Sequence, residues 1–199
     1  MEILGKQILL RDWELEDLAS YKQWMVGNPV WKTMDAPYYP LASEAKLNAG
    51  LAHRKQIITE KLFHEPRNGF VVARMDNRAL VGVVNWYWES EETSWMSNGI
   101  AIFDPAFWGK GIGYEALGLW NQYLLDEFEE VVRLDLRTWS GNIGMMRLAE
   151  KLGYQLEARF RKARVVDGKY YDSIGYGVLR EEWNALYPVG FQRFLYEEK

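Results

Sequence analysis

The chain has 199 residues with 48% apolar and 26% charged residues, a composition typical of one folded domain. It contains no cysteine, which excludes disulfide scaffolds, thiolate metal sites and cysteine nucleophiles, and we expect no metal centre. A net charge of −4 argues against nucleic-acid binding through bulk electrostatics. No apolar run reaches the roughly 18 residues of a membrane span, and the first residues do not resemble a signal peptide. We therefore expect a cytoplasmic protein that binds neither nucleic acid nor membrane.

Apolar spacing in the first third of the chain predicts a strand and two helices, separated by a segment in which three prolines forbid regular structure. Ser43 is a typical N-cap for the second helix. The irregular segment carries the large aromatic residues Trp31, Tyr38 and Tyr39, which either line a pocket or plug the core. The expected elements are strand 7–11, helix 14–25, irregular segment 28–40 and helix 44–63.

After residue 69 the pattern alternates with a period of two, which predicts an antiparallel meander of three strands. A glycine-rich loop, a helix and a further strand follow and form one βαβ unit. Asp167 and Gly168 are a strong signal for a two-residue hairpin. These observations predict a single mixed α/β domain. The expected elements are strands 70–75, 79–88 and 94–103, helix 112–128, strand 131–138, helix 142–152, and strands 154–166 and 169–179.

The glycine-rich loop is the clearest chemical motif. Its glycines open a helix, so several backbone N–H groups point into one space, where an anion such as a phosphate binds well. The alternative is a glycine turn selected only for tight packing. Residues 111–116 also match a permissive dinucleotide fingerprint, but a Rossmann domain needs successive βαβ units, and here an antiparallel meander precedes the loop. The loop consists of Trp108, Gly109, Lys110, Gly111, Ile112 and Gly113.

Three runs of sequence resemble a known family: GIAIFDPAFWGKGIGYEAL, TWSGNIGMMRLAEKLGY and GKYYDSIGYGVLREEW. They are similar to the GNAT acetyltransferases, in particular the RimJ/RimL-like branch of ribosomal-protein N-acetyltransferases. The resemblance implies a mostly antiparallel twisted sheet with a central, splayed parallel strand pair and flanking helices. We expect one domain over residues 1–183, with 184–199 as a C-terminal extension that packs on it or on a partner subunit, in a monomer or a homodimer.

The resemblance implies that acetyl-CoA is the cosubstrate and that its acetyl group passes directly to a primary amine, on a small molecule or on a protein N-terminus or lysine. The glycine-rich loop would hold the pyrophosphate. Further expected contacts to the cofactor come from Ile100, Ile102, Asn142 and Arg147.

The expected catalytic residues follow from departures from the family pattern. Ser97 stands where many relatives carry a glutamate base, and Met145 and Ala149 stand where relatives carry hydroxyl acids. The remaining candidates are Ser97, Ser140 and Asn142, although Asn142 can also serve simply as a helix cap. The nearby acids at 89, 91 and 92 lie in a polar turn that is more typical of a solvated surface.

The expected acceptor site contains Trp31, Tyr38, Tyr39, Trp86, Trp88 and Asp172. Asp172 could instead fix the register of the last hairpin by pairing with an arginine across it. Two other functions remain open. The missing acid and base are compatible with an acyl-CoA-binding sensor without catalysis. The dinucleotide fingerprint at 111–116 is compatible with a nicotinamide-dependent enzyme.

Overall fold

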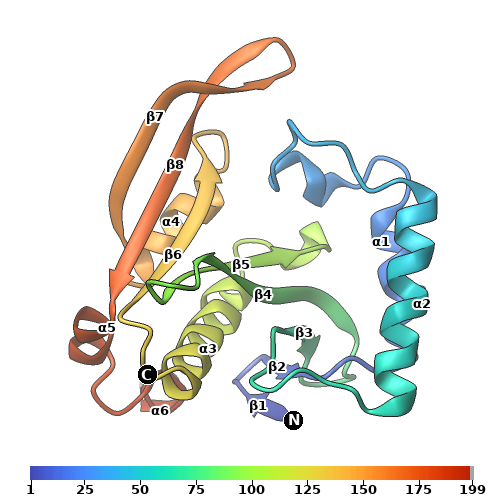
Figure 1. The fold of residues 1–199 in the computed structure, drawn as a ribbon, viewed down its shortest axis with the longest axis horizontal. Coiled ribbons are helices and arrows are strands. Elements are labelled where there is room, and N and C mark those ends of the chain that lie inside the picture. The colour runs from blue at the N-terminus through green and yellow to red at the C-terminus, as the bar shows by residue number, and fades with distance from the viewer. Residues whose placement is uncertain (198–199) are drawn as a thin grey trace.

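A computed structural model describes residues 1–197 and contains one eight-stranded sheet (Figure 1). The strand order is β1-β2-β3-β4-β5-β6-β8-β7, and every neighbouring pair is antiparallel except β5 and β6. The strands are β1 (Glu2–Leu4), β2 (Ile8–Arg11), β3 (Gly69–Arg74), β4 (Leu80–Ser90), β5 (Trp95–Ile102), β6 (Arg133–Trp139), β7 (Gln155–Val166) and β8 (Lys169–Leu179). The helices are α1 (Asp17–Met25), α2 (Glu44–Glu60), α3 (Ile112–Glu127), α4 (Ile143–Lys151), α5 (Arg180–Leu186) and α6 (Phe191–Glu197), with short 3₁₀ turns η1 (Val30–Thr33) and η2 (Pro105–Phe107).

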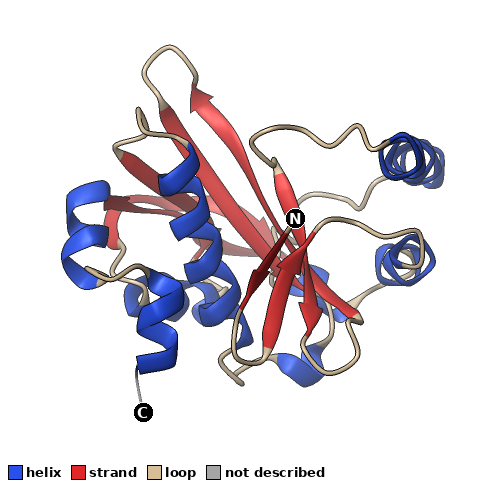
Figure 2. Ribbon diagram, turned by 90° about the horizontal axis from the view of Figure 1, so that it is seen from below, coloured by secondary structure: helices blue, strands red, loops and turns tan. Residues whose placement is uncertain are grey.

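Helices cover both faces of the sheet (Figure 2). Successive residues of β2 and β3 point to opposite faces, so Leu9 and Val71 join one apolar cluster while Leu10 and Val72 join the other. The larger cluster contains the buried face of α3, and the smaller one includes Trp31 of η1. The mixed α/β fold with one parallel pair is thereby confirmed. None of the helices within residues 1–197 has the length and apolarity needed to cross a membrane.

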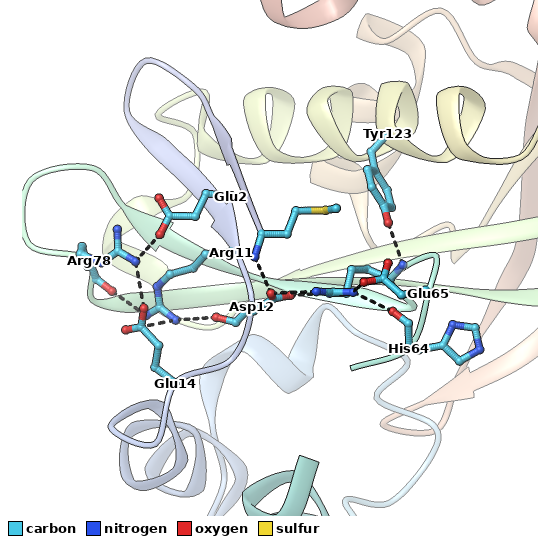
Figure 3. A network of polar contacts seen from close by, with 10 residues as sticks. Glu2, Arg11, Asp12, Glu14, His64, Glu65, Arg78 and Tyr123 are labelled. Atoms are coloured by element: carbon cyan, nitrogen blue, oxygen red, sulfur yellow. Dashed lines mark hydrogen bonds and ion pairs between the residues drawn. The ribbon is translucent and has the colours of Figure 1, made fainter. Parts of the chain in front are cut away.

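The helix α1 begins at Asp17 rather than at residue 14. The reason is a buried ion pair: Asp17 accepts hydrogen bonds from Arg11 at 2.7 and 2.8 Å and also from the Glu14 amide at 2.8 Å. The chain must turn over residues 14–16 to make these bonds. Figure 3 shows the neighbouring network, in which Asp12 accepts from Arg67 at 2.7 Å and so joins β2 to the segment before β3.

The C-terminal segment forms two short helices that the sequence pattern did not predict. Trp183 of α5 and Phe191 of α6 are fully buried against the larger core cluster. Gly118 of α3 makes room for this contact, because a Cβ atom there would lie 2.0 Å from Phe191 Cζ. The Gln122 side chain completes the interface by accepting hydrogen bonds from Trp183 Nε1 and the Phe191 amide, both at 3.0 Å.

Candidate functional site

The parallel strands β5 and β6 separate partway along their length. They pair only where Met96, Ser97 and Asn98 lie opposite residues 134–136. Beyond Asn98, β5 continues to Ile102 and still pairs with β4, while β6 continues to Trp139 and pairs with β8. The centre of the sheet therefore opens into a wedge between two strands.

The edge of β5 that faces the wedge carries backbone groups without a strand partner. The Phe103 amide donates to the Val81 carbonyl oxygen at 2.8 Å, on the β4 side. Because hydrogen-bonding direction alternates along a strand, the amides of Ile100 and Ile102 point into the wedge. Both residues are partly exposed although β5 is a central strand. This edge can accept an extended, amide-containing ligand as a substitute strand.

The glycine-rich loop lies at the N-terminal end of α3, beside the wedge. Gly109 and Gly111 have φ angles of 70° and 85°, a left-handed conformation that strains other residues. Trp108 fixes the loop to the end of β5, because its Nε1 donates to the Ile102 carbonyl oxygen at 2.9 Å. A Cβ atom on Gly109 would meet nothing within 4 Å, so the loop surface is open to a ligand.

The first amides of α3 are available to an anion. Within residues 1–197, no group accepts a hydrogen bond from the amides of Ile112 or Gly113. Their dipoles add to the positive end of the helix macrodipole, which favours negative charge at this position. Lys110 lies in the loop, and Arg147 precedes Leu148, whose side chain approaches Gly113. Both cations are exposed and can add positive charge near the loop.

A second segment joins the separated strands on the opposite face of the sheet. We call residues 30–36 the strap. At one side, Trp31 packs edge-on against Phe103, just after β5, with ring centroids 5.3 Å apart. At the other side, the carbonyl oxygen of Met34 accepts from Trp139 Nε1 at 2.8 Å and from Asn142 Nδ2 at 3.0 Å. The strap therefore connects the ends of β5 and β6 where these strands no longer pair.

An aromatic wall continues from the strap to the β7–β8 hairpin, which projects from the body of the molecule (Figure 1). Tyr38 packs against Tyr39 and Trp139, with centroids 4.9 and 6.5 Å apart, and Trp139 packs edge-on against Tyr171 at 4.8 Å. The Arg164 guanidinium of β7 lies 4.6 Å from the centre of the Tyr38 ring. The irregular segment and the hairpin thus form one continuous surface.

Asp35 on the strap has an unusual environment. Its side chain is exposed, yet surrounding groups limit its hydration and raise the pKa of the carboxyl, an effect that Lys32 partly offsets. No donor among the described residues forms a hydrogen bond to this carboxylate. The carboxylate of Asp35 therefore binds a proton more readily than that of an ordinary aspartate.

The three residues expected to be catalytic all make protein contacts. The Ser97 hydroxyl is fully buried and donates to the Asp135 carbonyl oxygen at 3.4 Å. The Ser140 hydroxyl accepts from the Asp172 amide at 2.9 Å. The Asn142 side chain caps α4 by accepting from the Met145 amide at 3.0 Å, while its other end holds the strap. Their catalytic roles remain predictions.

Asp172 faces the inside of its hairpin. Its carboxylate accepts from Arg159 Nε at 2.6 Å and from the Lys162 amide at 2.9 Å. The Lys162 amide, followed by Arg159, lowers the pKa of Asp172 below its usual value. These bonds hold the irregular part of β7, where pairing shifts between Phe160 and Arg164. The contacts match the structural alternative considered for Asp172.

The structure does not bring all the expected acceptor residues together. Trp86 and Trp88 lie on the α3 face of the sheet and pack against Phe128, with centroids 5.2 and 5.8 Å away. Trp31 is 7% exposed and belongs to the core of the other face. Of the aromatic residues expected here, Tyr38 and Tyr39 line the aromatic wall.

Sequence reasoning missed three features of this region: Asp35, Trp139 and the Met34 carbonyl group. Trp139 is the last residue of β6 and stands three positions before Asn142, the N-cap of α4. This position, between the strand end and the helix cap, was the signal that could have identified it. The other two depend on how an irregular segment folds across the sheet, for which apolar periodicity contains no information.

Comparisons with known proteins agree on one family. The chain matches the model described as "Acetyltransferase (GNAT) domain" over residues 7–155. It is 24% identical over 179 residues to the SPbeta prophage-derived uncharacterized N-acetyltransferase YokL of Bacillus subtilis (strain 168), covering 90% of this chain and 93% of that protein.

Solved structures share the fold. A GCN5-related N-acetyltransferase from Brucella melitensis superposes with a TM-score of 0.71 at 19% identity, covering 100% of this chain and 86% of that one. RimL, a ribosomal L7/L12 alpha-N-protein acetyltransferase solved in complex with coenzyme A, superposes with a TM-score of 0.64 at 18% identity, covering 90% and 98%. The family model spans most of the chain and the sheet has the wedge and loop described above. The chain belongs to the GNAT family of N-acetyltransferases.

Proposed function

We propose that this enzyme holds acetyl-CoA between β5 and β6 and transfers the acetyl group directly to a primary amine that enters from the strap face. One observation carries the proposal: the wedge beyond Asn98 opens next to the loop and the available amides at the start of α3. The acceptor is a small-molecule amine or the amine of a protein N-terminus or lysine.

The residues present fit the cofactor. The loop offers open space at Gly109 and amides at Ile112 and Gly113 for the pyrophosphate, with Lys110 and Arg147 as neighbouring cations. The free edge at Ile100 and Ile102 suits the amides of the pantetheine arm. When bound, acetyl-CoA supplies a thioester carbonyl open to attack by a neutral amine.

The two faces of the wedge have different roles in this proposal. The loop and helices α3 and α4 form the cofactor face. Helix α4 packs close to the start of α3, because a Cβ atom on Gly113 would lie 3.4 Å from Leu148 Cδ2. Trp31 of the strap packs in the apolar cluster of the other face, and the wall at Tyr38 and Tyr39 continues from the strap. An acceptor with an apolar or aromatic part would pack on this wall.

The amine must lose a proton before it can attack, because an ammonium group has no free electron pair. We assign proton acceptance to Asp35, because it follows Met34 on the strap, next to the end of β6, and because its pKa is raised above that of an ordinary aspartate. Ser97, Ser140 and Asn142 remain candidates for orienting the amine or protonating the departing thiolate. The side chains of these three residues already form the hydrogen bonds within the protein that are described above, which occupy part of their donor and acceptor capacity.

Two linked measurements test the proposal. Calorimetric titration with acetyl-CoA is expected to show binding at micromolar to millimolar concentration, and a thiol-release assay with a panel of amines is expected to show acceptor-dependent formation of free CoA. Absence of binding would contradict the cofactor assignment. Binding without acceptor-dependent thiol release across small amines and peptides would instead support an acyl-CoA sensor.

A further inference from the structure

The C-terminal helix α6 is bonded to the turn between β1 and β2. Gln192 Nε2 donates to the Leu4 carbonyl oxygen at 2.7 Å, and the Tyr196 hydroxyl donates to the Gly5 carbonyl oxygen at 2.8 Å. The N-terminal end of α6 is anchored separately, because the side chain of Phe191 is fully buried in the core. The two polar bonds are therefore additional to the packing that holds α6 in place.

The same turn contacts a buried carboxylate in the first turn of α3. Glu115 is 2% exposed, and its Oε1 accepts from the amides of Gln7 at 2.8 Å and Ile8 at 3.1 Å. A Cβ atom on Gly5 would lie 2.0 Å from this oxygen, so the turn packs directly on it. A carboxylate is well placed here, since the start of a helix favours negative charge.

The turn also reaches the glycine-rich loop itself. Gln7 Nε2 donates to the Lys110 carbonyl oxygen at 3.4 Å, and a Cβ atom on Gly111 would lie 3.6 Å from the same nitrogen. On the other side of the first turn of α3, the Tyr114 ring packs against Phe191 of α6 with centroids 5.4 Å apart. The contacts therefore run from α6, directly or through the turn at residues 4–8, to the glycine-rich loop and to the first turn of α3.

We propose that α6 is a positioning element for the phosphate-binding loop, acting through the turn at residues 4–8. Tyr196, Gln192 and Glu115 are positioning residues: they hold the backbone that presents the loop amides and do not touch the ligand. The identity of that ligand rests on the proposed function. Backbone amides bind an anion well only when their orientation is fixed beforehand, because otherwise binding must order them.

The double variant Tyr196→Phe/Gln192→Ala tests the proposal, because it removes both polar bonds and leaves the apolar anchors intact. Losing two hydrogen bonds of ordinary strength is expected to raise the Kd for CoA about three- to tenfold. Hydrogen exchange of the Gln7, Ile8 and Glu115 amides, which donate to the Glu115 carboxylate or to the Gly111 carbonyl oxygen, is expected to accelerate, while exchange in the β7–β8 hairpin stays unchanged.

Arg193→Ala is the matched control, since Arg193 lies on the same helix and, within residues 1–197, makes only an exposed pair with Glu197 at 2.7 Å. The control is expected to leave both the Kd for CoA and the exchange of the Gln7, Ile8 and Glu115 amides at wild-type values. An equal loss of affinity in the control would mean that α6 acts only through general stability, and would overturn the proposal.

Glu115 provides a second test. Glu115→Gln retains an oxygen that can accept from Gln7 and Ile8, so its Kd for CoA is expected to stay within about threefold of wild type, whereas Glu115→Ala loses affinity. A Tyr196→Phe/Gln192→Ala variant with wild-type CoA affinity and wild-type exchange at Gln7, Ile8 and Glu115 would overturn the proposal. If the wild type itself binds no CoA, the proposed function fails, and the exchange measurement still decides whether α6 positions the loop.

Discussion

Asp35 and the loop glycines show what individual residues contribute to this site. The glycines were recognisable in the sequence because alternating glycines before an amphipathic helix have few other uses. In the structure, Gly109 and Gly111 have the positive φ angles that favour glycine. Asp35 carried no such signal. Its altered pKa arises from crowding by the folded chain around it, a property of tertiary structure alone.

Asp35→Asn is expected to lower kcat/KM by at least about tenfold for the amine that the wild type acetylates fastest in the panel, with the Kd for CoA unchanged. The wild-type rate should fall as pH drops through the raised pKa of Asp35, because the protonated carboxyl cannot accept a proton. The variant should lack this dependence. Asp167→Asn, at the exposed hairpin tip, is the control and should behave as wild type.

Stability is expected to move in the opposite direction. A carboxyl whose folded pKa lies above its unfolded value disfavours the folded state once the pH exceeds the unfolded pKa. Asp35→Asn should therefore keep or slightly raise the melting temperature at neutral pH. A variant with reduced melting temperature and an unchanged pH profile would contradict the role assigned to Asp35.

At the scale of elements, the strap is the feature that sequence patterns could not place. The three prolines of segment 28–40, which flank the strap, predicted irregular structure but not the path of the strap across the sheet, because that path depends on the distant partners Trp139 and Asn142. The same limit explains why Trp86 and Trp88 were wrongly expected at the acceptor site. Their alternation along β4 showed that they share one face of the sheet, but not that this is the face covered by α3. The positions of the other strands and helices, apart from β1, α5 and α6, were predicted closely, since apolar periodicity reports directly on burial.

Trp139→Phe is expected to loosen the strap, because phenylalanine keeps most of the ring packing but cannot donate to the Met34 carbonyl oxygen. Amide exchange at Met34 and Asp35 should accelerate about threefold to tenfold. Trp95→Phe is the matched control, since the Trp95 indole N–H has no hydrogen-bond partner within residues 1–197. Equal exchange of the strap amides in the two variants would show that the Met34 bond does not hold the strap.

For the whole molecule, one departure from regular sheet structure organises the site. Seven neighbouring strand pairs build the sheet, and only the parallel pair β5 and β6 comes apart while each strand keeps its other partner. The wedge is therefore held open by the rest of the sheet and needs no large rearrangement to admit a ligand. In the proposed function, the cofactor occupies one face of the wedge and the acceptor the other.

The most direct test of this account is a titration of ¹⁵N-labelled protein with acetyl-CoA, followed by amide chemical shifts. The largest changes are expected at residues 109–113 of the loop and at Ile100 and Ile102 on the free edge of β5. Saturable binding with changes in the loop and on this edge would support the proposed cofactor site. Absence of saturable binding, or changes confined to segments away from both the loop and the wedge, would contradict it.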